Sequence, residues 1–261
     1  HSPTLTNAST SAMPHRLFAA AVEMGGLQGS AARGEASVLE AEAGLFPPGV
    51  KAAVFDVVGT LVDPSPSVAV AYQQAARRHG VEVAVAELAP RFGAAWTRQE
   101  AIDAVLQPAH STSRQREHQR WHAIVRDVFA GLADSDATDA IFQDLWQHFA
   151  LPTAWQATAH GPELVAAALE AGLQVALASN FDERLFEVAA AVEPLVQAAH
   201  VFPSSELGWR KPAAAFFRAV EARLGMRSDE LVMFGDNPEL DIAAARRAGW
   251  HAVLLPAKGS S

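Results

Sequence analysis

The segment from Lys51 to Asp63, K-A-A-V-F-D-V-V-G-T-L-V-D, contains the features that decide the fold of this chain. Ala52 to Phe55 form a short apolar run of the kind that builds a buried strand, and Gly59 begins a turn that leads the chain away from it. Asp56 therefore follows the carboxyl end of a strand. Ligands of open α/β sheets bind at that edge, so Asp56 is the first candidate for chemistry. The alternative is an Asp that caps the turn.

Composition narrows the class of protein. The chain has 261 residues, half of them apolar, which is enough for a sizeable core. Its formal charge of -9 argues against nucleic acid or an anionic membrane surface as the main partner. The absence of cysteine excludes disulfides, thiolate metal sites and a cysteine nucleophile, and it fits a cytoplasmic protein. No apolar run approaches the ~20 residues that a membrane helix needs.

Two stretches interrupt the α/β pattern. Residues 1–48 are rich in Ala, Ser, Gly and Thr, and we expect a weakly structured extension with room for one helix at Met13 to Met24. Residues 65–159 read as helices without convincing strands, which predicts a helical cap inserted after the first strand. The expected cap helices are Ser67–His79, Glu87–Val105, Arg114–Phe129 and Asp136–Phe149.

Strands and helices alternate again after the expected cap. This alternation predicts a mainly parallel, doubly wound sheet, with residues 49–64 and 160–261 as its core. The expected strands are Leu173–Ala178, His200–Phe202, Leu231–Phe234 and His251–Leu255. The expected helices are Pro162–Ala171, Asp182–Val192, Pro212–Leu224 and Pro238–Ala248.

Further polar residues fall near the carboxyl ends of these strands. Ser179 and Asn180 could donate hydrogen bonds to an oxyanion, or could cap the next helix. Lys211 precedes an expected helix and suits a phosphate, although it could equally be a surface lysine. Asp236 and Asp241 lie five residues apart across a turn, an oxygen-rich arrangement suited to Mg²⁺. Their alternative is an N-cap and a first-turn Asp that the helix dipole stabilises.

In combination, these motifs resemble those of the haloacid dehalogenase-like hydrolase superfamily, over Lys51 to the C-terminus. The resemblance rests on F-D-V-V-G-T-L at residues 55–61, A-S-N at 178–180, R-K-P at 210–212 and G-D-N-P-E-L-D at 235–241. S-N-F-D-E-R-L at 179–185 and G-W-R-K-P at 208–212 are similar to its group of rhythmically expressed and haloacid-dehalogenase-like domain-containing proteins.

The resemblance implies a Rossmann-like core, a helical cap, and a Mg²⁺-dependent phosphatase that forms an aspartyl-phosphate. Asp56 would be the nucleophile, and a metal ligand together with the Val58 carbonyl, Asp236 and Asp241. We expect a small phosphorylated metabolite as substrate and a monomer or homodimer.

The resemblance also implies the residues that bind the phosphoryl group. Ser179 and Lys211 would hold its oxygens, with Asn180 beside them, and Thr60 would support the nucleophile loop. Carboxylates alone repel a phosphate, so the metal ion and Lys211 must offset their charge before Asp56 can attack.

One position departs from the phosphatase pattern. The superfamily's phosphatases carry a second Asp two residues after the nucleophile as general acid, and here that residue is Val58. Losing a general acid typically costs ~10²–10⁴ in rate, most for poor leaving groups. We therefore expect activated phosphates, a substitute acid or a weakened enzyme. Candidate substitutes are His79, His110, His118 and His122, each of which could instead be a solvated or packed histidine of the cap.

Two other functions stay open. Superfamily dehalogenases also lack the second Asp and need no metal, but they lose the fourth-motif pattern that this chain keeps. A catalytically weak binding or regulatory protein is the second alternative. Cap residues that could line a substrate pocket, or could simply pack and form ion pairs, are Arg91, Phe92, Trp96, Arg98, Trp121 and Arg126.

Overall fold

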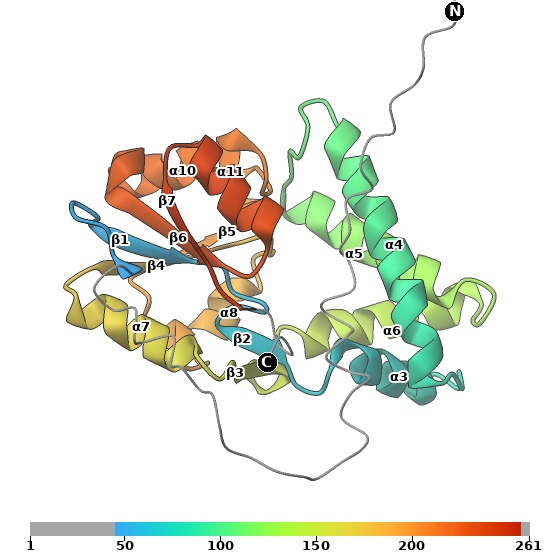
Figure 1. Cartoon of the computed structure of the whole chain (residues 1–261). Helices are drawn as coiled ribbons and strands as arrows, with labels where there is room; N and C mark the ends of the chain where they lie inside the picture. The colour runs from blue at the N-terminus through green and yellow to red at the C-terminus, as the bar shows by residue number, and fades with distance from the viewer. Residues whose placement is uncertain (1–44, 257–261) are drawn as a thin grey trace, which may run out of the picture.

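A five-stranded parallel sheet forms the centre of the computed structural model, which describes residues 45–256 (Figure 1). The strand order is β5-β4-β1-β6-β7, so the chain winds outward from β1 in both directions. The strands are β1 (Ala52–Phe55), β4 (Gln174–Ser179), β5 (His200–Pro203), β6 (Leu231–Gly235) and β7 (His251–Leu254). The predicted doubly wound parallel sheet is confirmed.

Helices cover both faces of this sheet (Figure 1). Ala53 and Phe55 of β1 share one apolar cluster with α7 (Gly161–Glu170) and α8 (Leu185–Ala189). Ala52 and Val54 share another with α10 (Ala214–Leu224) and α11 (Ala244–Arg247). Successive side chains of a strand point to opposite faces, so a strand buried on both faces is continuously apolar, as this one is.

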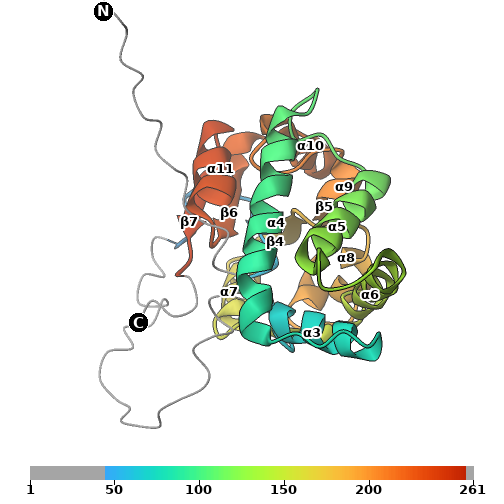
Figure 2. The same ribbon diagram turned by 90° about the vertical axis from the view of Figure 1, so that its right-hand side faces the viewer.

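Four helices between β2 and β3 form a second body with its own apolar core, which we call the helical block. Its helices are α3 (Val68–Arg78), α4 (Val85–Val105), α5 (Arg114–Phe129) and α6 (Ser135–His148). Tyr72 lies in its centre, stacked on Phe129 and edge-to-face with Phe92, whose ring centroid is 5.6 Å away. Figures 1 and 2 show the block beside the sheet, with α4 running along its length.

A two-stranded antiparallel ribbon joins the sheet to the helical block. Its strands are β2 (Val62–Pro64) and β3 (Trp155–Ala157), with Val62 opposite Ala157 and with the short 3-10 helix η2 (Pro152–Ala154) leading into β3. The sequence predicted neither strand, because three residues are too few to show a period.

Several predicted boundaries are wrong. The helix expected at Asp182–Val192 is reduced to α8, because the Asp182 carboxylate accepts hydrogen bonds from the main chain and guanidinium of Arg184 and so forms a turn. α10 begins at Ala214 rather than Pro212, and the helix expected at Pro238 begins as a π-helix, η5 (Pro238–Ala243). Short unpredicted elements are η3 (Leu195–Gln197), α9 (Ser204–Leu207) and η4 (Ser228–Glu230).

The described chain begins inside the core. Leu45 is buried and Phe46 packs edge-on against Phe234, although the expected boundary assigned both residues to the extension. The helix expected at Met13 to Met24 lies outside the described residues. Across residues 45–256, none of the helices has the length and apolar composition needed to cross a lipid bilayer.

Candidate active site

Asp56 lies directly after β1, at the carboxyl edge of the sheet. Its main-chain N–H donates to the carbonyl of Phe234 at 2.9 Å, which continues the pairing with β6. Gly59 then turns the chain with φ of +83°, in the left-handed region that glycine adopts readily. A Cβ at Gly59 would lie 3.0 Å from the Asp236 carboxylate, so a larger residue would crowd the next carboxylate of the site.

Asp236 and Asp241 approach Asp56 from the end of β6. Oxygen atoms of the three carboxylates lie within 4.8 Å of one another. Asn237 caps η5 by accepting hydrogen bonds from two main-chain N–H groups, and its own N–H donates to Asp241 Oδ2 at 3.1 Å. A Cβ at Gly235 would collide with the Asp241 side chain, so this close approach requires glycine.

Lys211 is buried beside two of these carboxylates, Asp56 and Asp241. Its Nζ donates to Asp56 Oδ1 at 2.7 Å and to Asp241 Oδ1 at 2.6 Å. The Asn180 side chain holds the main chain of Lys211 by donating to its carbonyl at 3.0 Å and accepting from its N–H at 2.7 Å. Both polar atoms of the Asn180 amide are therefore engaged in positioning Lys211.

The carboxylates perturb one another. Burial and the nearby charges of Asp56 and Asp241 raise the pKa of Asp236 to about 7. Burial likewise raises the pKa of Asp241 to about 6, although Lys211 opposes the rise. Burial acts to lower the pKa of Lys211, but Asp241 and Asp56 outweigh it and the pKa is raised. Burial is the largest cause of both raised carboxyl pKa values, and repulsion from the neighbouring carboxylates adds to it.

This donor set fits a divalent cation. Three ionised carboxylates and one ammonium leave a net charge of about -2, which a divalent ion would balance. Hard carboxylate oxygens are the ligands that Mg²⁺ prefers, usually one or two carboxylates together with water. Asp56 and Asp236 suit direct ligation, whereas both oxygens of Asp241 already accept hydrogen bonds.

The other predicted site residues lie around this centre. Ser179 is buried at the end of β4, the strand beside β1. Thr60 is buried, and its hydroxyl has no hydrogen-bond partner within residues 45–256, so it is a donor that a ligand could use. The Thr60 carbonyl accepts from the hydroxyl of Thr158, which ties the loop after Asp56 to the residue that follows β3. Val58 packs its side chain against the core and offers no proton.

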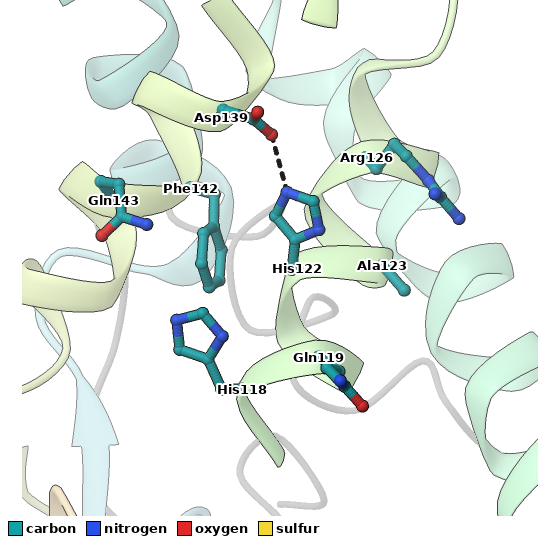
Figure 3. Close-up of a pocket in the computed structure, with 8 residues that line it drawn as sticks. All are labelled: His118, Gln119, His122, Ala123, Arg126, Asp139, Phe142 and Gln143. Atoms are coloured by element: carbon teal, nitrogen blue, oxygen red, sulfur yellow. Dashed lines mark hydrogen bonds and ion pairs between the residues drawn. The ribbon is translucent and has the colours of Figure 1, made fainter. Parts of the chain in front are cut away.

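Three of the candidate substitute acids, His79, His118 and His122, have side-chain partners within the helical block. His79 pairs with Asp144 at 2.9 Å, and the main chain of His110 bonds to Asp103 and Arg210. His118 and His122 line a pocket of about 450 Å³ between α5 and α6, where His122 pairs with Asp139 (Figure 3). Phe142 lies between the two imidazole rings, and none of the carboxylates of the site lines this pocket.

The cap residues named as possible pocket residues mostly pack or form ion pairs. Phe92 is buried and stacks on Trp96, which contacts Trp121. Arg98 pairs with Asp127, and Arg91 donates to main-chain carbonyls of the helical block. Arg126 lines the α5–α6 pocket.

One functional candidate escaped the sequence reasoning. Arg210, which precedes Lys211, is 2% exposed and turns its side chain into carboxylates of the helical block. The available signal was an Arg directly before the candidate phosphate-binding lysine. Its partners, however, lie about a hundred residues earlier in the chain, where no local pattern reveals them.

Comparison with known proteins gives a consistent result. A family model described as "haloacid dehalogenase-like hydrolase" matches residues 50–249. "Haloacid dehalogenase-like hydrolase domain-containing protein 3" of Bos taurus is 29% identical over 203 residues, covering 77% of this chain and 80% of the relative.

Solved structures share the fold at low identity. A defluorinating L-2-haloacid dehalogenase superposes with a TM-score of 0.62 at 20% identity, covering 79% of this chain and 83% of its own. A Haemophilus somnus protein described as "a predicted phosphoglycolate phosphatase" gives 0.56 at 16% identity, covering 79% and 85%. At these identities the likeness concerns the fold alone.

Proposed function

Because the chain belongs to the haloacid dehalogenase-like hydrolase family, we propose that it is a Mg²⁺-dependent phosphatase of a small phosphorylated metabolite. The observation that carries this proposal is the cluster of Asp56, Asp236 and Asp241, with Lys211 bonded to Asp56 and Asp241. The proposal also includes a cytoplasmic location, which the composition favours. It further includes a monomer or homodimer as the working form.

Asp56 is the nucleophile in this proposal. Its carboxylate attacks phosphorus while the Lys211 ammonium holds it in place through Oδ1. The bond from phosphorus to the leaving oxygen breaks as the bond from Asp56 forms, and the leaving oxygen takes a proton from solvent water. Water then hydrolyses the aspartyl-phosphate, which releases inorganic phosphate and restores the carboxylate.

The surrounding residues orient and neutralise the phosphoryl group. Lys211 supplies a fixed positive charge, and the buried hydroxyls of Ser179 and Thr60 are candidate donors to the phosphoryl oxygens. Bound Mg²⁺, held by Asp56, Asp236 and the Val58 carbonyl with Asp241 beside them, would offset the negative charge of the phosphate. Without an acid at Val58, phosphates with good leaving groups, acyl or aryl, are the favoured substrates.

Hydrolysis of an aryl phosphate tests the proposal. We expect release of the phenol by the parent protein in Mg²⁺, and none in chelator or from Asp56→Asn. Mg²⁺ titration by calorimetry should give saturable binding that Asp236→Asn weakens. Absence of both hydrolysis and Mg²⁺ binding across a panel of aryl and metabolite phosphates would refute it.

Val58 keeps a second function under consideration, hydrolysis of a carbon–halogen bond in a 2-haloacid. Asp56 would displace the halide and water would hydrolyse the ester, with no leaving group to protonate. The carboxylate cluster argues against this function because it leaves a net negative charge that an organic acid does not balance. Halide release from 2-haloacids in chelator would support it, and no release would exclude it.

A further inference from the structure

The loop that carries Lys211 is paired with the helical block. The N–H of Thr112 donates to the carbonyl of Gly208, and the N–H of Arg210 donates to the carbonyl of His110, both at 2.9 Å. Ser111 and Trp209 form the antiparallel bridge between these bonds. Residues 208–210 of the core are therefore held by the segment that links α4 to α5.

The Arg210 side chain extends from this loop into the helical block. Its Nη1 donates to both carboxylate oxygens of Glu117, at 2.7 and 2.8 Å. Nη2 lies 3.5 Å from Glu100, and Nε lies 3.7 Å from Asp103. Glu117 and Asp103 are buried, so a core residue is the counter-charge of carboxylates inside the block.

These contacts belong to a cluster of six charged side chains with equal numbers of positive and negative charges, which we call the buried ionic cluster. Two further arginines complete it: Arg120 donates to Asp103 at 2.8 Å and to Glu100 at 2.5 Å, and Arg116 donates to Asp103 at 2.8 Å. The cluster thus contains Arg116, Arg120, Arg210, Glu100, Asp103 and Glu117, three charges of each sign. Arg120 also lies over the ring of Trp96, 4.5 Å from its centroid. Such a network holds its side chains in place, because breaking one pair would leave a buried charge without its partner and reduce the free energy of unfolding.

Lys211 is consequently held from two sides. Asn180, from the end of β4, binds both main-chain polar groups of Lys211. On the other side, the preceding residue is anchored in the helical block by its main chain and its guanidinium. The Lys211 ammonium then reaches Asp56 and Asp241 from a backbone that the core and the block fix jointly.

We propose that Arg210 is a positioning residue, which couples the buried ionic cluster of the helical block to the placement of Lys211 against Asp56. The inference deepens the proposed phosphatase function and rests on it for its effect on turnover. The effect of Arg210 on the placement of Lys211 can be measured without enzymatic activity.

The main test is the double variant Arg210→Met/Glu117→Gln. It removes one charge of each sign and leaves two arginines facing two carboxylates, so no buried charge loses its balance. Arg114→Met is the matched control, because Arg114 also links α5 to the core, through Glu206, but in an exposed pair. Arg210→Lys is the conservative variant: it keeps the charge, but one ammonium cannot reach all three carboxylates.

The first readout is amine acetylation followed by mass spectrometry. The chain has three lysines, Lys51, Lys211 and Lys258. The Lys51 side chain is 61% exposed and that of Lys211 is 3% exposed, so Lys51 is an internal reference. We expect acetylation of Lys211, relative to Lys51, to rise at least about tenfold in the double variant, less in Arg210→Lys, and not at all in Arg114→Met.

The second readout is aryl phosphate kinetics in Mg²⁺. A displaced catalytic group can cost about a hundredfold, so we expect kcat to fall about 10- to 100-fold while KM stays within about threefold. Arg210→Lys should restore part of kcat. Circular dichroism and a cooperative unfolding transition establish that each variant is folded.

The two proposals fail separately. The role of Arg210 would be overturned if the double variant folds and both its Lys211 acetylation and its kcat are unchanged. If that variant does not fold, wild-type values of both quantities in Arg210→Lys would overturn it. A parent without phosphatase activity would refute the proposed function alone, since the acetylation comparison still tests Arg210.

Discussion

At the scale of single residues, Val58 is the position at which the proposed phosphatase lacks a general acid. We expect Val58→Asp to raise kcat/KM for alkyl phosphates about 10²- to 10⁴-fold, because the new carboxyl would protonate a poor leaving group. Aryl phosphates should gain much less, since their leaving oxygen needs little protonation. The ratio of the two kcat/KM values measures the effect.

Val58→Asn is the control for this experiment, since it adds a polar group of the same size that cannot transfer the proton. Equal gains in the Asp and Asn variants would contradict a missing acid. An inert Val58→Asp variant that still binds Mg²⁺ would favour the alternative of a family member that binds without turnover.

Asp236 makes stability depend on pH in a defined direction. Its pKa is about 7 in the fold and 3.8 as an ordinary value. The folded state therefore retains a proton that the unfolded state releases, and this contribution to stability is lost as pH rises through 7. In chelator at pH 8, we expect Asp236→Asn to increase the free energy of unfolding by about 2 to 4 kcal/mol, from ~1.4 kcal/mol per pKa unit.

Urea denaturation at pH 8 and pH 4 measures that difference. The advantage of the Asn variant should shrink toward pH 4, where the parent carboxyl is protonated in the fold. A variant no more stable than the parent at pH 8 would contradict the raised pKa. The same substitution should reduce stabilisation by Mg²⁺, which separates loss of a ligand from loss of the fold.

Asp56, Ser179 and Asp236 could be located at this scale because each lies at the end of a strand. Asp56 and Asp236 each directly follow an apolar run, and parallel strands bring such positions to one edge. The engagement of Asn180 with Lys211 was not predictable, because it depends on how two loops 31 residues apart meet. Arg210 was missed for the same reason, with partners 93 and more residues away.

At the scale of elements, we expect opposite effects from alanine substitution at two glycines. Gly235 ends β6 where a Cβ would strike Asp241, so Gly235→Ala should displace that carboxylate from Lys211 and lower kcat at least about tenfold. Gly93 lies inside α4 with nothing within 4 Å of its Cβ position, so Gly93→Ala should raise stability by about 0.5–1 kcal/mol.

Thermal unfolding and aryl phosphate kinetics of both variants provide the comparison. Gly93→Ala should leave kcat unchanged, because α4 contributes no carboxylate to the site. Wild-type kcat in Gly235→Ala would show that the loop after β6 relaxes without moving Asp241.

Elements with strong periodicity and clear stops were predicted closely. α5 has the predicted bounds Arg114–Phe129, with Ser113 capping its first turn and Gly131 following its end. β2 and β3 were missed because their stability comes from each other, through pairing across the inserted block. α8 was overpredicted because the contact between Asp182 and Arg184 competes with the helix.

At the scale of the whole molecule, Arg184 is a second tether between the sheet and the helical block. It pairs with Asp182 at 2.7 Å, donates to the carbonyl of Trp146 at 3.0 Å, and lies 3.6 Å from the centroid of that ring. We expect Arg184→Gln to cost about 3–5 kcal/mol, because it leaves Asp182 buried without its counter-charge.

Urea denaturation at pH 7 gives this cost, and Arg227→Gln is the matched control. Arg227 also pairs with an Asp two residues away in sequence, but both side chains are exposed, and such a pair contributes little to stability. Equal effects of the two substitutions would contradict the assigned role of burial. Because Arg184 and Arg210 belong to different contacts, their effects on stability should add.

The ribbon of β2 and β3 has a consequence for how this architecture diversifies. Val62 lies opposite Ala157, so the chain leaves the sheet and returns to it at one place, whatever length of sequence lies between. We therefore expect the strand order to stay the same when the segment between β2 and β3 is lengthened, shortened or replaced. If the proposed function is right, we expect a different intervening segment to change which molecules reach Asp56 while the carboxylates at the sheet edge stay in place, provided that the new segment supplies a counter-charge for Arg210.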